Sequence, residues 1–446
     1  MLRAAARRLF SSSSQQSNCY DIVIVGSGMV GAALSYALGQ EPVLADKHIL
    51  VLEASVKPPQ KLSREDPYGI RVVNVNMGSV ELLKRLGVWS DITAVRAREF
   101  DHMHIWDSCA NSVVLFDPTH HSSIGYIVEN DLITDVLCNR VNECGNVEVQ
   151  RGRRVVTLDK SSTSWRGITL DNGMEIKTKL LVGADGAQSN IRQLAGMNTI
   201  GWKYNQSAVV AKLDVSYAGD NRTAWQRFLP TGPIALLPLT DSSSSLVWST
   251  TPQHAKQLMS LDGVHFITAV NAALCDYYPR SQWVDLLTSS LFNQILSGTP
   301  LVNDEQQPPH ISGVTSGSIG SYPLALHHSV RYVQDRIVLV GDAAHTIHPL
   351  AGLGVNLGFG DVSTLTDLLR GAASMGSDVG HRSHLLQYES IRQRHNVPIM
   401  AFVDITKRIY STSSTIPVIV RASIARLVSS VYPIKGLLTS QAEKIV

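Results

Sequence analysis

Short apolar runs separated by amphipathic stretches are the main pattern in the first part of the chain. Residues 20–25 and 48–52 are largely apolar and rich in β-branched side chains, as in strands buried on both faces. The Ala- and Leu-rich residues 29–38 between them predict a helix, and further buried strands are predicted at 179–185 and 336–340. Strands that alternate with helices in this way indicate a mainly parallel sheet.

The rest of the chain follows two other patterns. Alternating runs that predict an antiparallel sheet lie at 207–213, 224–229, 233–239 and 246–250. Asp171-Asn172-Gly173 predicts a tight hairpin. Helical periodicity dominates near the end, at 354–370, 384–408 and 417–431.

A glycine-rich turn follows the first predicted strand. Gly26, Gly28 and Gly31 have the G-x-G-x-x-G spacing, and Glu53 ends the next strand about 20 residues further on. Such glycines permit a tight turn, the approach of a pyrophosphate and close helix packing, while the acid accepts hydrogen bonds from ribose hydroxyls. A turn without a ligand is the alternative, but the surrounding strands and helix favour a Rossmann fingerprint.

Acidic residues also end two later strands. Asp185 stands next to Gly186, and Asp342 next to Gly341. Ligands bind at the carboxyl ends of strands in a doubly wound sheet, so either carboxylate can bond a cofactor hydroxyl. Either can equally cap the helix that follows. The long segments between these strands indicate an interrupted nucleotide-binding fold.

Composition narrows the classes of function. Lys and Arg number 39 against 37 Asp and Glu, and 44% of the 446 residues are hydrophobic. This balance argues against nucleic acid as the main partner and against global disorder. The five cysteines contain no C-x-x-C pair, which speaks against a disulfide framework and a zinc knuckle. No apolar run approaches the ~18 residues of a spanning helix.

Residues 1–17 have the composition of a targeting signal. They contain Arg3, Arg7 and Arg8, a serine run and no acid, with apolar residues interleaved. We expect a mitochondrial presequence. A frayed basic terminus is the alternative.

Three motifs together resemble those of the single-component flavin-dependent aromatic hydroxylases. They are the glycine-rich turn at 26–31, Asp185-Gly186, and G-D-A-A-H at 341–345 with H-P-L-A-G at 348–352. Finer segments resemble one branch, the mitochondrial monooxygenases of coenzyme Q biosynthesis. Those segments are 125–130, 224–230, 232–239, 245–250 and 392–396. The resemblance covers roughly residues 20–410 in order.

The resemblance implies FAD as the cofactor. The cofactor-binding residues that it implies are Gly26, Gly28, Gly31, Glu53, Arg71, Asn130, Asp185, Asp342, Gly354, Val355 and Asn356. The glycine turn and Glu53 would hold the ADP half, and Asp342 the ribityl chain or pyrophosphate. Backbone N–H groups of 354–356 would face the polar edge of the flavin ring. Leu353 departs from the glutamine common in this branch, so the contact of that side chain is not expected.

The resemblance also implies the chemistry. Reduced FAD and O₂ give a C4a-hydroperoxide, which attacks an electron-rich phenol while the protein orients the ring and excludes water. Trp225, Arg227 and Pro349 are candidates for the substrate pocket, although a tryptophan on a strand, such as Trp225, belongs more often to a core. His345 and His348 fit structural roles beside the cofactor turn better than that of a base. No catalytic side chain is assigned, and no metal site is expected.

The predicted function is hydroxylation of a polyprenylated phenol, a polyprenyl hydroxybenzoate, at ring carbon 5 in ubiquinone biosynthesis. Alternatives are a hydroxylase or epoxidase acting on another apolar substrate, or a non-enzymatic prenyl-lipid escort. Expected partners are the substrate and O₂, ferredoxin and ferredoxin reductase as electron donors, and other coenzyme Q biosynthesis proteins in a complex. The expected location is the matrix side of the mitochondrial inner membrane, as a peripheral protein.

The predicted fold is α/β: a Rossmann-type FAD-binding domain interrupted by a mainly antiparallel β-sheet substrate domain, with a helical C-terminal region. The predicted bounds are 1–17 for the presequence, 18–200 and 326–410 for the FAD-binding parts, 201–325 for the substrate domain and 411–446 for the C-terminal segment. In that segment Arg421 and Arg426 accompany apolar residues, the composition of an interfacial amphipathic helix. Helices packed on the protein's own core are the alternative.

Overall fold

The computed structural model describes residues 18–110, 112–116, 123–159, 164–216, 219–276 and 307–430. The expected presequence and the chain after residue 430 lie outside the described residues.

The first sheet has a parallel centre. Its strand order is β18-β19-β11-β1-β2-β8, and the pairs from β19 to β8 are parallel. The bounds are β1 (Cys19–Val25), β2 (Ile49–Glu53), β8 (Val147–Arg151), β11 (Glu175–Gly183), β18 (Val333–Gln334) and β19 (Ile337–Leu339). Ile22, Val23 and Ile24 are fully buried, as in a strand covered on both faces. The predicted parallel sheet is confirmed.

An antiparallel ribbon extends this sheet. Strands β9 (Val155–Leu158) and β10 (Arg166–Leu170) pair in order with β11. Gly173 has a φ of +80° in the turn between β10 and β11, a conformation that favours glycine. The hairpin predicted at Asp171-Asn172-Gly173 is therefore confirmed.

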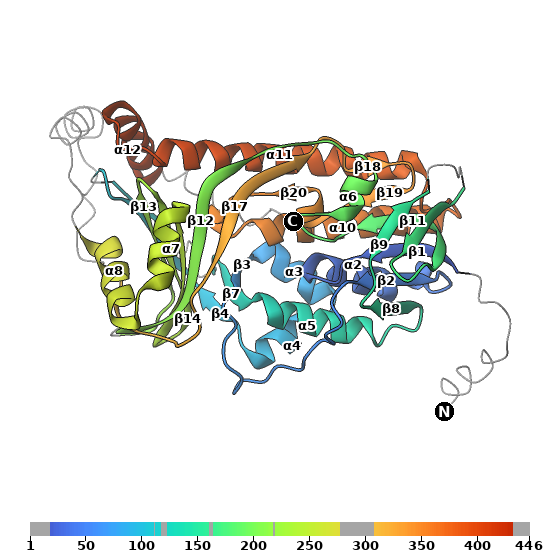
Figure 1. Ribbon diagram of the computed structural model, residues 1–446, viewed down its shortest axis with the longest axis horizontal. Coiled ribbons are helices and arrows are strands. Elements are labelled where there is room, and N and C mark those ends of the chain that lie inside the picture. The colour runs from blue at the N-terminus through green and yellow to red at the C-terminus, as the bar shows by residue number, and fades with distance from the viewer. Residues whose placement is uncertain are drawn as a thin grey trace.

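Helices surround the parallel strands. Helix α2 (Met29–Gln40) packs against α5 (Asn130–Val141) and α10 (Gly354–Ser374), and these helices lie beside the sheet in Figure 1. Ala32, Ala33 and Leu34 are buried where α2 meets the strands. Shorter elements are η2 (Pro42–Leu44), α3 (Met77–Arg85), α4 (Trp89–Val95), α6 (Asn190–Leu194), η3 (Gly341–Ala343) and η4 (Pro349–Ala351). A three-stranded antiparallel sheet consists of β3 (Val72–Asn76), β7 (Gly125–Glu129) and β4 (Arg98–Phe100).

The large second sheet is mainly antiparallel. It has nine strands in the order β20-β17-β12-β15-β14-β13-β5-β6, and β16 also pairs with β12. The bounds are β5 (His102–Asp107), β6 (Val113–Phe116), β12 (Thr199–Ser216), β13 (Thr223–Leu229), β14 (Gly232–Thr240), β15 (Ser243–Thr250), β16 (His310–Val314), β17 (Gly320–Ser329) and β20 (His345–Thr346). The predicted runs at 207–213, 224–229, 233–239 and 246–250 all lie on these strands. Strands β5 and β6 belong to this sheet because β5 pairs in parallel with β13. Their residues lie within 18–200, the range predicted for the first FAD-binding part.

The two faces of the large sheet have different neighbours. Helices α7 (Pro252–Ser260) and α8 (Gly263–Cys275) flank one face, where Val209 and Leu213 share a core with Phe266. On the other face Ala208 and Leu324 pack in a smaller apolar cluster with Leu357 of α10. The sheet therefore stands between its own helices and the nucleotide-binding half.

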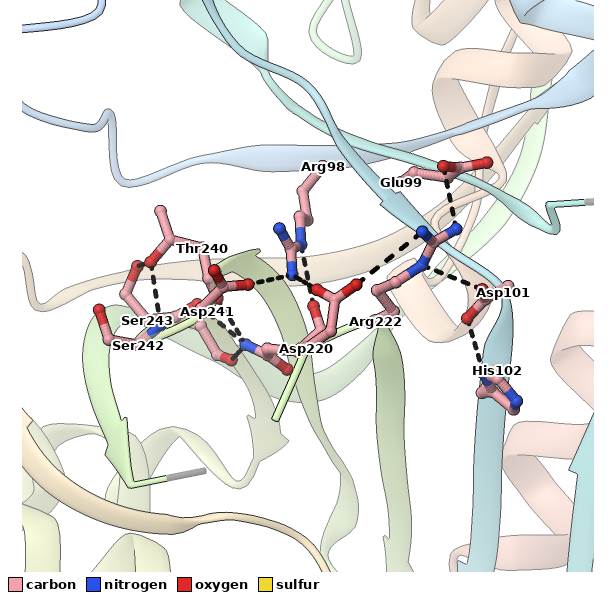
Figure 2. A network of polar contacts seen from close by, with 12 residues as sticks. Arg98, Glu99, Asp101, His102, Asp220, Arg222, Thr240, Asp241, Ser242 and Ser243 are labelled. Carbon is pink, nitrogen blue, oxygen red and sulfur yellow. Dashed lines mark hydrogen bonds and ion pairs between the residues drawn. The ribbon is translucent and has the colours of Figure 1, made fainter. Parts of the chain in front are cut away.

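A polar network joins the small sheet to the large one. Figure 2 shows Arg98 reaching Asp220 and Asp241, and Arg222 reaching Glu99 and Asp101. Arg98 and Glu99 belong to β4, whereas Asp220 and Arg222 precede β13. Exposed ion pairs of this kind add little stability singly. Their position across the junction favours one alignment of the two sheets.

Helix α11 (Arg382–Tyr410) runs along the molecule from the nucleotide-binding half to the large sheet, and α12 (Thr415–Ser430) follows it (Figure 1). Arg421 of α12 is 2% exposed and binds Asp107 at the end of β5 through its Nε (2.7 Å) and Nη2 (3.0 Å). Its Nη1 donates to the carbonyls of Ile409 and Thr412. Arg421 is thus buried, and the expectation that it belongs to a membrane-facing basic set is wrong.

Removing this buried charge should make the protein less stable to unfolding. We expect Arg421→Leu to lower the free energy of unfolding by about 3–5 kcal/mol, because it leaves Asp107 buried without its counter-charge. Chemical denaturation measures the change. Arg382→Leu is the control, since its pair with Asp335 has side chains that are 56% and 75% exposed and should matter by less than about 1 kcal/mol. Equal effects of the two substitutions would contradict the structural role given to Arg421.

Candidate functional site

The glycines of the first turn have different surroundings. A Cβ on Gly31 would lie 2.1 Å from the carbonyl oxygen of Gly26, and one on Gly26 would lie 2.4 Å from that of Ala184. A Cβ on Gly28 would meet nothing within 4 Å, and Gly28 has an ordinary φ of −66°. Gly26 and Gly31 are therefore required by the fold itself, whereas Gly28 leaves open space at the N-terminus of α2. That space, beside free helix N–H groups, fits a pyrophosphate.

Glu53 holds the same turn from the end of β2. One carboxylate oxygen accepts hydrogen bonds from the backbone N–H (2.7 Å) and the hydroxyl (2.8 Å) of Ser27. The other accepts from the N–H of Ser55 (2.8 Å). A carboxylate has about four acceptor positions. The geometry thus leaves Glu53 able to accept a ribose hydroxyl as well as fixing Ser27.

Asp342 stands where β19 ends and a 3₁₀ turn begins. Asp342 is exposed by its accessible surface, but many protein atoms surround it. Desolvation by these atoms raises the pKa of Asp342, and the charges of His345 and Arg71 act in the opposite direction. Among the residues that the structure describes, none donates a hydrogen bond to this carboxylate. Asp342 is therefore an open acceptor at the same edge of the sheet as Gly28.

Arg71 and Asn130 meet through the backbone. The N–H of Asn130 donates to the carbonyl of Arg71 (3.0 Å), and the Arg71 guanidinium lies 5.4 Å from the ring centre of Tyr322 on β17. The side chain of Arg71 is exposed and close enough to Asp342 to influence its pKa. Arg71 and Asp342 therefore lie in the same part of the structure, and a contact of Arg71 with the cofactor stays a prediction.

A buried ion pair supports the segment before Arg71. Glu129 is 2% exposed; it accepts from the N–H of Gly69 (2.6 Å) and pairs with Arg96. Arg96 also donates to the carbonyls of Asp66 (2.5 Å) and Pro67 (3.2 Å). Sequence reasoning missed both residues. Glu129 lies in segment 125–130, which resembles the coenzyme Q branch. An acid at the end of an apolar strand was the sequence feature that could have indicated its role.

Residues 354–356 form the first turn of α10, whose N–H groups have no partner within the helix. The Asn356 side chain is fully engaged: it accepts from Asn76 N–H (3.1 Å) and the Ser79 hydroxyl (2.6 Å). Its amide donates to the carbonyls of Asn74 (2.8 Å) and Gly352 (3.0 Å). Only backbone groups of this turn are thus free to face a cofactor.

Asp185 is occupied by its own helix. It accepts from the hydroxyl of Ser189 (2.5 Å) and from the N–H groups of Asn190 (2.7 Å) and Ile191 (3.1 Å) at the start of α6. This geometry corresponds to the capping alternative for Asp185. A direct cofactor contact of its carboxylate stays a prediction.

The candidates for the substrate pocket lie in different places. Trp225 is 3% exposed in the core shared with α8, and Arg227 donates to the carbonyls of Ala273 (3.0 Å) and Asp276 (2.7 Å) at the end of that helix. Pro349 begins η4, next to the loop that leads to α10. These contacts give Trp225 and Arg227 a place in packing, and their part in a substrate pocket stays a prediction.

The two histidines of the third motif are buried. His345 Nε2 lies 2.7 Å from a carboxylate oxygen of Asp361. Burial lowers the pKa of His348 to about 3, so this imidazole is neutral at physiological pH, and it packs edge-on against Tyr204 at 5.1 Å between ring centres. Both positions are those of supporting residues. The described residues contain no cluster of His, Cys, Asp and Glu suited to a metal ion.

Comparisons with known proteins agree with this geometry. The chain matches the family described as FAD binding domain over residues 19–279 and 305–403. It is 42% identical to the mitochondrial ubiquinone biosynthesis monooxygenase COQ6 of Xenopus tropicalis, over 100% of this chain and 97% of that protein. The corresponding protein of Rattus norvegicus is also 42% identical, over 99% and 94%.

Among solved structures, the p-nitrophenol 4-monooxygenase PnpA of Pseudomonas putida has the same fold. Its TM-score is 0.68 at 16% identity, covering 96% of this chain and 98% of that one. At this identity the likeness concerns the fold alone. The family match and the full-length identity settle the relationship: the chain belongs to the FAD binding domain family and, within it, to the ubiquinone biosynthesis monooxygenases.

Proposed function

We propose that this chain is a mitochondrial FAD-dependent monooxygenase of ubiquinone biosynthesis that hydroxylates ring carbon 5 of a polyprenylated hydroxybenzoate. One observation carries the cofactor part of the proposal. Gly28 and Asp342, far apart in the sequence, are both open to solvent at carboxyl ends of strands in one parallel sheet. In folds of this kind a dinucleotide binds across the edge at which the carboxyl ends of the parallel strands meet.

The residues divide the work of holding FAD. The turn at Gly28 and the N–H groups of α2 would bind the pyrophosphate, Glu53 a ribose hydroxyl, and Asp342 a hydroxyl of the ribityl chain. The N-terminus of α10 would favour negative charge at the polar edge of the flavin ring. When bound, FAD supplies the redox chemistry that activates O₂. The protein's remaining task is to orient the phenol and exclude water.

Gly28 allows a clean test of the cofactor site. We expect Gly28→Val to abolish FAD retention, because the new side chain would occupy the space of the pyrophosphate without striking the protein itself. The visible spectrum of the purified variant measures its flavin content. Gly145→Val is a matched control: Gly145 is also exposed with nothing within 4 Å of its Cβ, but it precedes β8 at the other edge of the sheet. Equal flavin content in wild type and Gly28→Val would contradict the assignment.

The electron source is proposed to be a separate protein. The sequence contains one dinucleotide fingerprint, and FAD would occupy it. We expect turnover of a polyprenyl hydroxybenzoate with O₂ when reduced ferredoxin and its reductase are supplied, and a product hydroxylated at ring carbon 5 by mass spectrometry and NMR. NADPH alone should not reduce the flavin at the rate of turnover. Such reduction would refute the donor, and hydroxylation at another carbon would refute the position.

We also propose that the protein binds the matrix side of the inner membrane through α11. Exposed residues recur on one side of that helix at helical spacing: Ile391, Arg394, Pro398, Phe402 and Ile405. Phe402 and Ile405 are 62% and 55% exposed. None of the helices in the described ranges has the length and hydropathy to cross a bilayer. An apolar stripe with basic residues suits the surface of an anionic leaflet, in which a polyprenyl phenol dissolves.

The surface continues beyond α11. Trp202 of β12 is 38% exposed, and the Arg408 guanidinium lies 4.9 Å from its ring centre. Asp404, the acid between them, accepts from Trp202 (3.2 Å) and pairs with Arg408 (2.7 Å). The aromatic, apolar and basic side chains thus lie together, and the charge of Asp404 is balanced by Arg408.

The membrane proposal predicts the effect of two substitutions. Phe402→Ser with Ile405→Ser should reduce sedimentation with vesicles that contain an anionic phospholipid, roughly tenfold or more, because two apolar side chains no longer insert. Val264→Ser is the control, since Val264 is 72% exposed on α8. Unchanged sedimentation of the double variant, or an equal loss in the control, would overturn the proposed face.

A further inference from the structure

The strongest unexplained feature is a buried carboxylate behind the third motif. Asp361 of α10 is fully buried and accepts from the backbone N–H of Gly341 (2.8 Å) and from Arg392 Nε (2.7 Å). His345 Nε2 lies 2.7 Å from it, and Asn396 donates at 3.3 Å. One side chain thus contacts both ends of the turn 341–345 and the helix α11.

The charges in this group are matched. Burial alone would raise the pKa of Asp361, but His345, Arg392 and the Gly341 N–H outweigh burial and lower it to about 2. Arg392 Nη2 donates to the Leu357 carbonyl (2.9 Å) and to Asn396 Oδ1 (3.0 Å). Gly360 of α10 leaves room for this arginine, because a Cβ at that position would lie 2.4 Å from the guanidinium. The two oxygens of Asp361 have four polar partners between them, and these hold the carboxylate in one orientation.

The turn that this group holds carries Asp342, which is exposed and accepts no side-chain hydrogen bond from the described residues. Gly341 N–H and His345 flank Asp342 on either side in the sequence, and both are bonded to the same oxygen of Asp361. Fixing the two flanks fixes the backbone of the residue between them. We propose that Asp361, with His345 and Arg392, is a positioning unit that presents Asp342 to FAD and thereby sets the affinity for the flavin.

This inference rests on the proposed FAD function, and the experiment separates the two. Full-length protein stripped of flavin is titrated with FAD, and the dissociation constant is read from flavin fluorescence. Asp361→Asn should raise that constant about 10- to 100-fold, the range expected when charge-assisted hydrogen bonds are lost. The free energy of unfolding of the flavin-free protein is measured in parallel.

The matched control is Asp107→Asn, which weakens a second buried aspartate–arginine pair, Asp107 with Arg421, near the C-terminal end of α11. It should destabilise the flavin-free protein by a similar amount and leave the FAD dissociation constant unchanged. A merely structural role for Asp361 would give the two variants the same FAD affinity, and that result would overturn the inference.

If Asp361→Asn does not fold, a second pair of variants tests the same inference. His345→Leu should weaken FAD binding and shift the flavin absorption bands, whereas His345→Gln, which keeps a donor for Asp361, should restore both toward wild type. Wild-type affinity and spectrum in His345→Leu would refute the positioning role. A wild-type protein that binds no FAD would instead refute the proposed function.

Discussion

Backbone packing at the first turn is the constraint on which the nucleotide-binding half depends. A side-chain carbon at Gly26 or Gly31 would overlap a carbonyl oxygen, so α2 can approach β1 and β11 only through bare backbone. That approach places the N-terminus of α2 at the carboxyl edge of the sheet, where the strands β1, β2 and β19 also end. An anion-binding helix end and acidic strand ends therefore share one edge as a consequence of packing.

Helix α11 connects this edge with the large sheet. In its first half Tyr388 donates to the Leu339 carbonyl of β19 (2.9 Å) and Arg392 pairs with Asp361. At its end Tyr410 stacks on Phe228 of β13, with 3.9 Å between ring centres. Buried charges are costly unless paired, so the bonds at Arg392 and Arg421 disfavour other alignments of the helix. Helix α11, with Arg421 of α12 at its end, thus helps to fix the two halves of the protein relative to each other.

The sequence predicts local structure better than long-range pairing, and particular elements show why. The runs that became β1, β2, β12 to β15 and the helices α10 to α12 carry their own periodicity. The parallel pair β5–β13 joins residues about 120 positions apart, and no local pattern signals such a partner. The expectation that Arg421 faces a membrane was wrong for a related reason. Composition shows that a helix is both apolar and basic, but a single buried acid, Asp107, decides which side the arginine faces.

Four acidic residues near the strand ends show why residue type alone does not assign a site. Glu53 already binds its own turn through Ser27. Asp185 is engaged by the N–H groups of α6, and Asp361 is surrounded by the Gly341 N–H, Arg392 and Asn396. Asp342 alone among these four has no donor from the described residues and faces solvent. In the sequence Glu53, Asp185 and Asp342 all stand at the end of a predicted strand and have similar reasons to bind a hydroxyl, whereas Asp361 lies inside a predicted helix. We therefore expect the number of bonds that the fold already makes to each carboxylate, rather than the motif in which it stands, to decide how far that carboxylate can accept a cofactor hydroxyl.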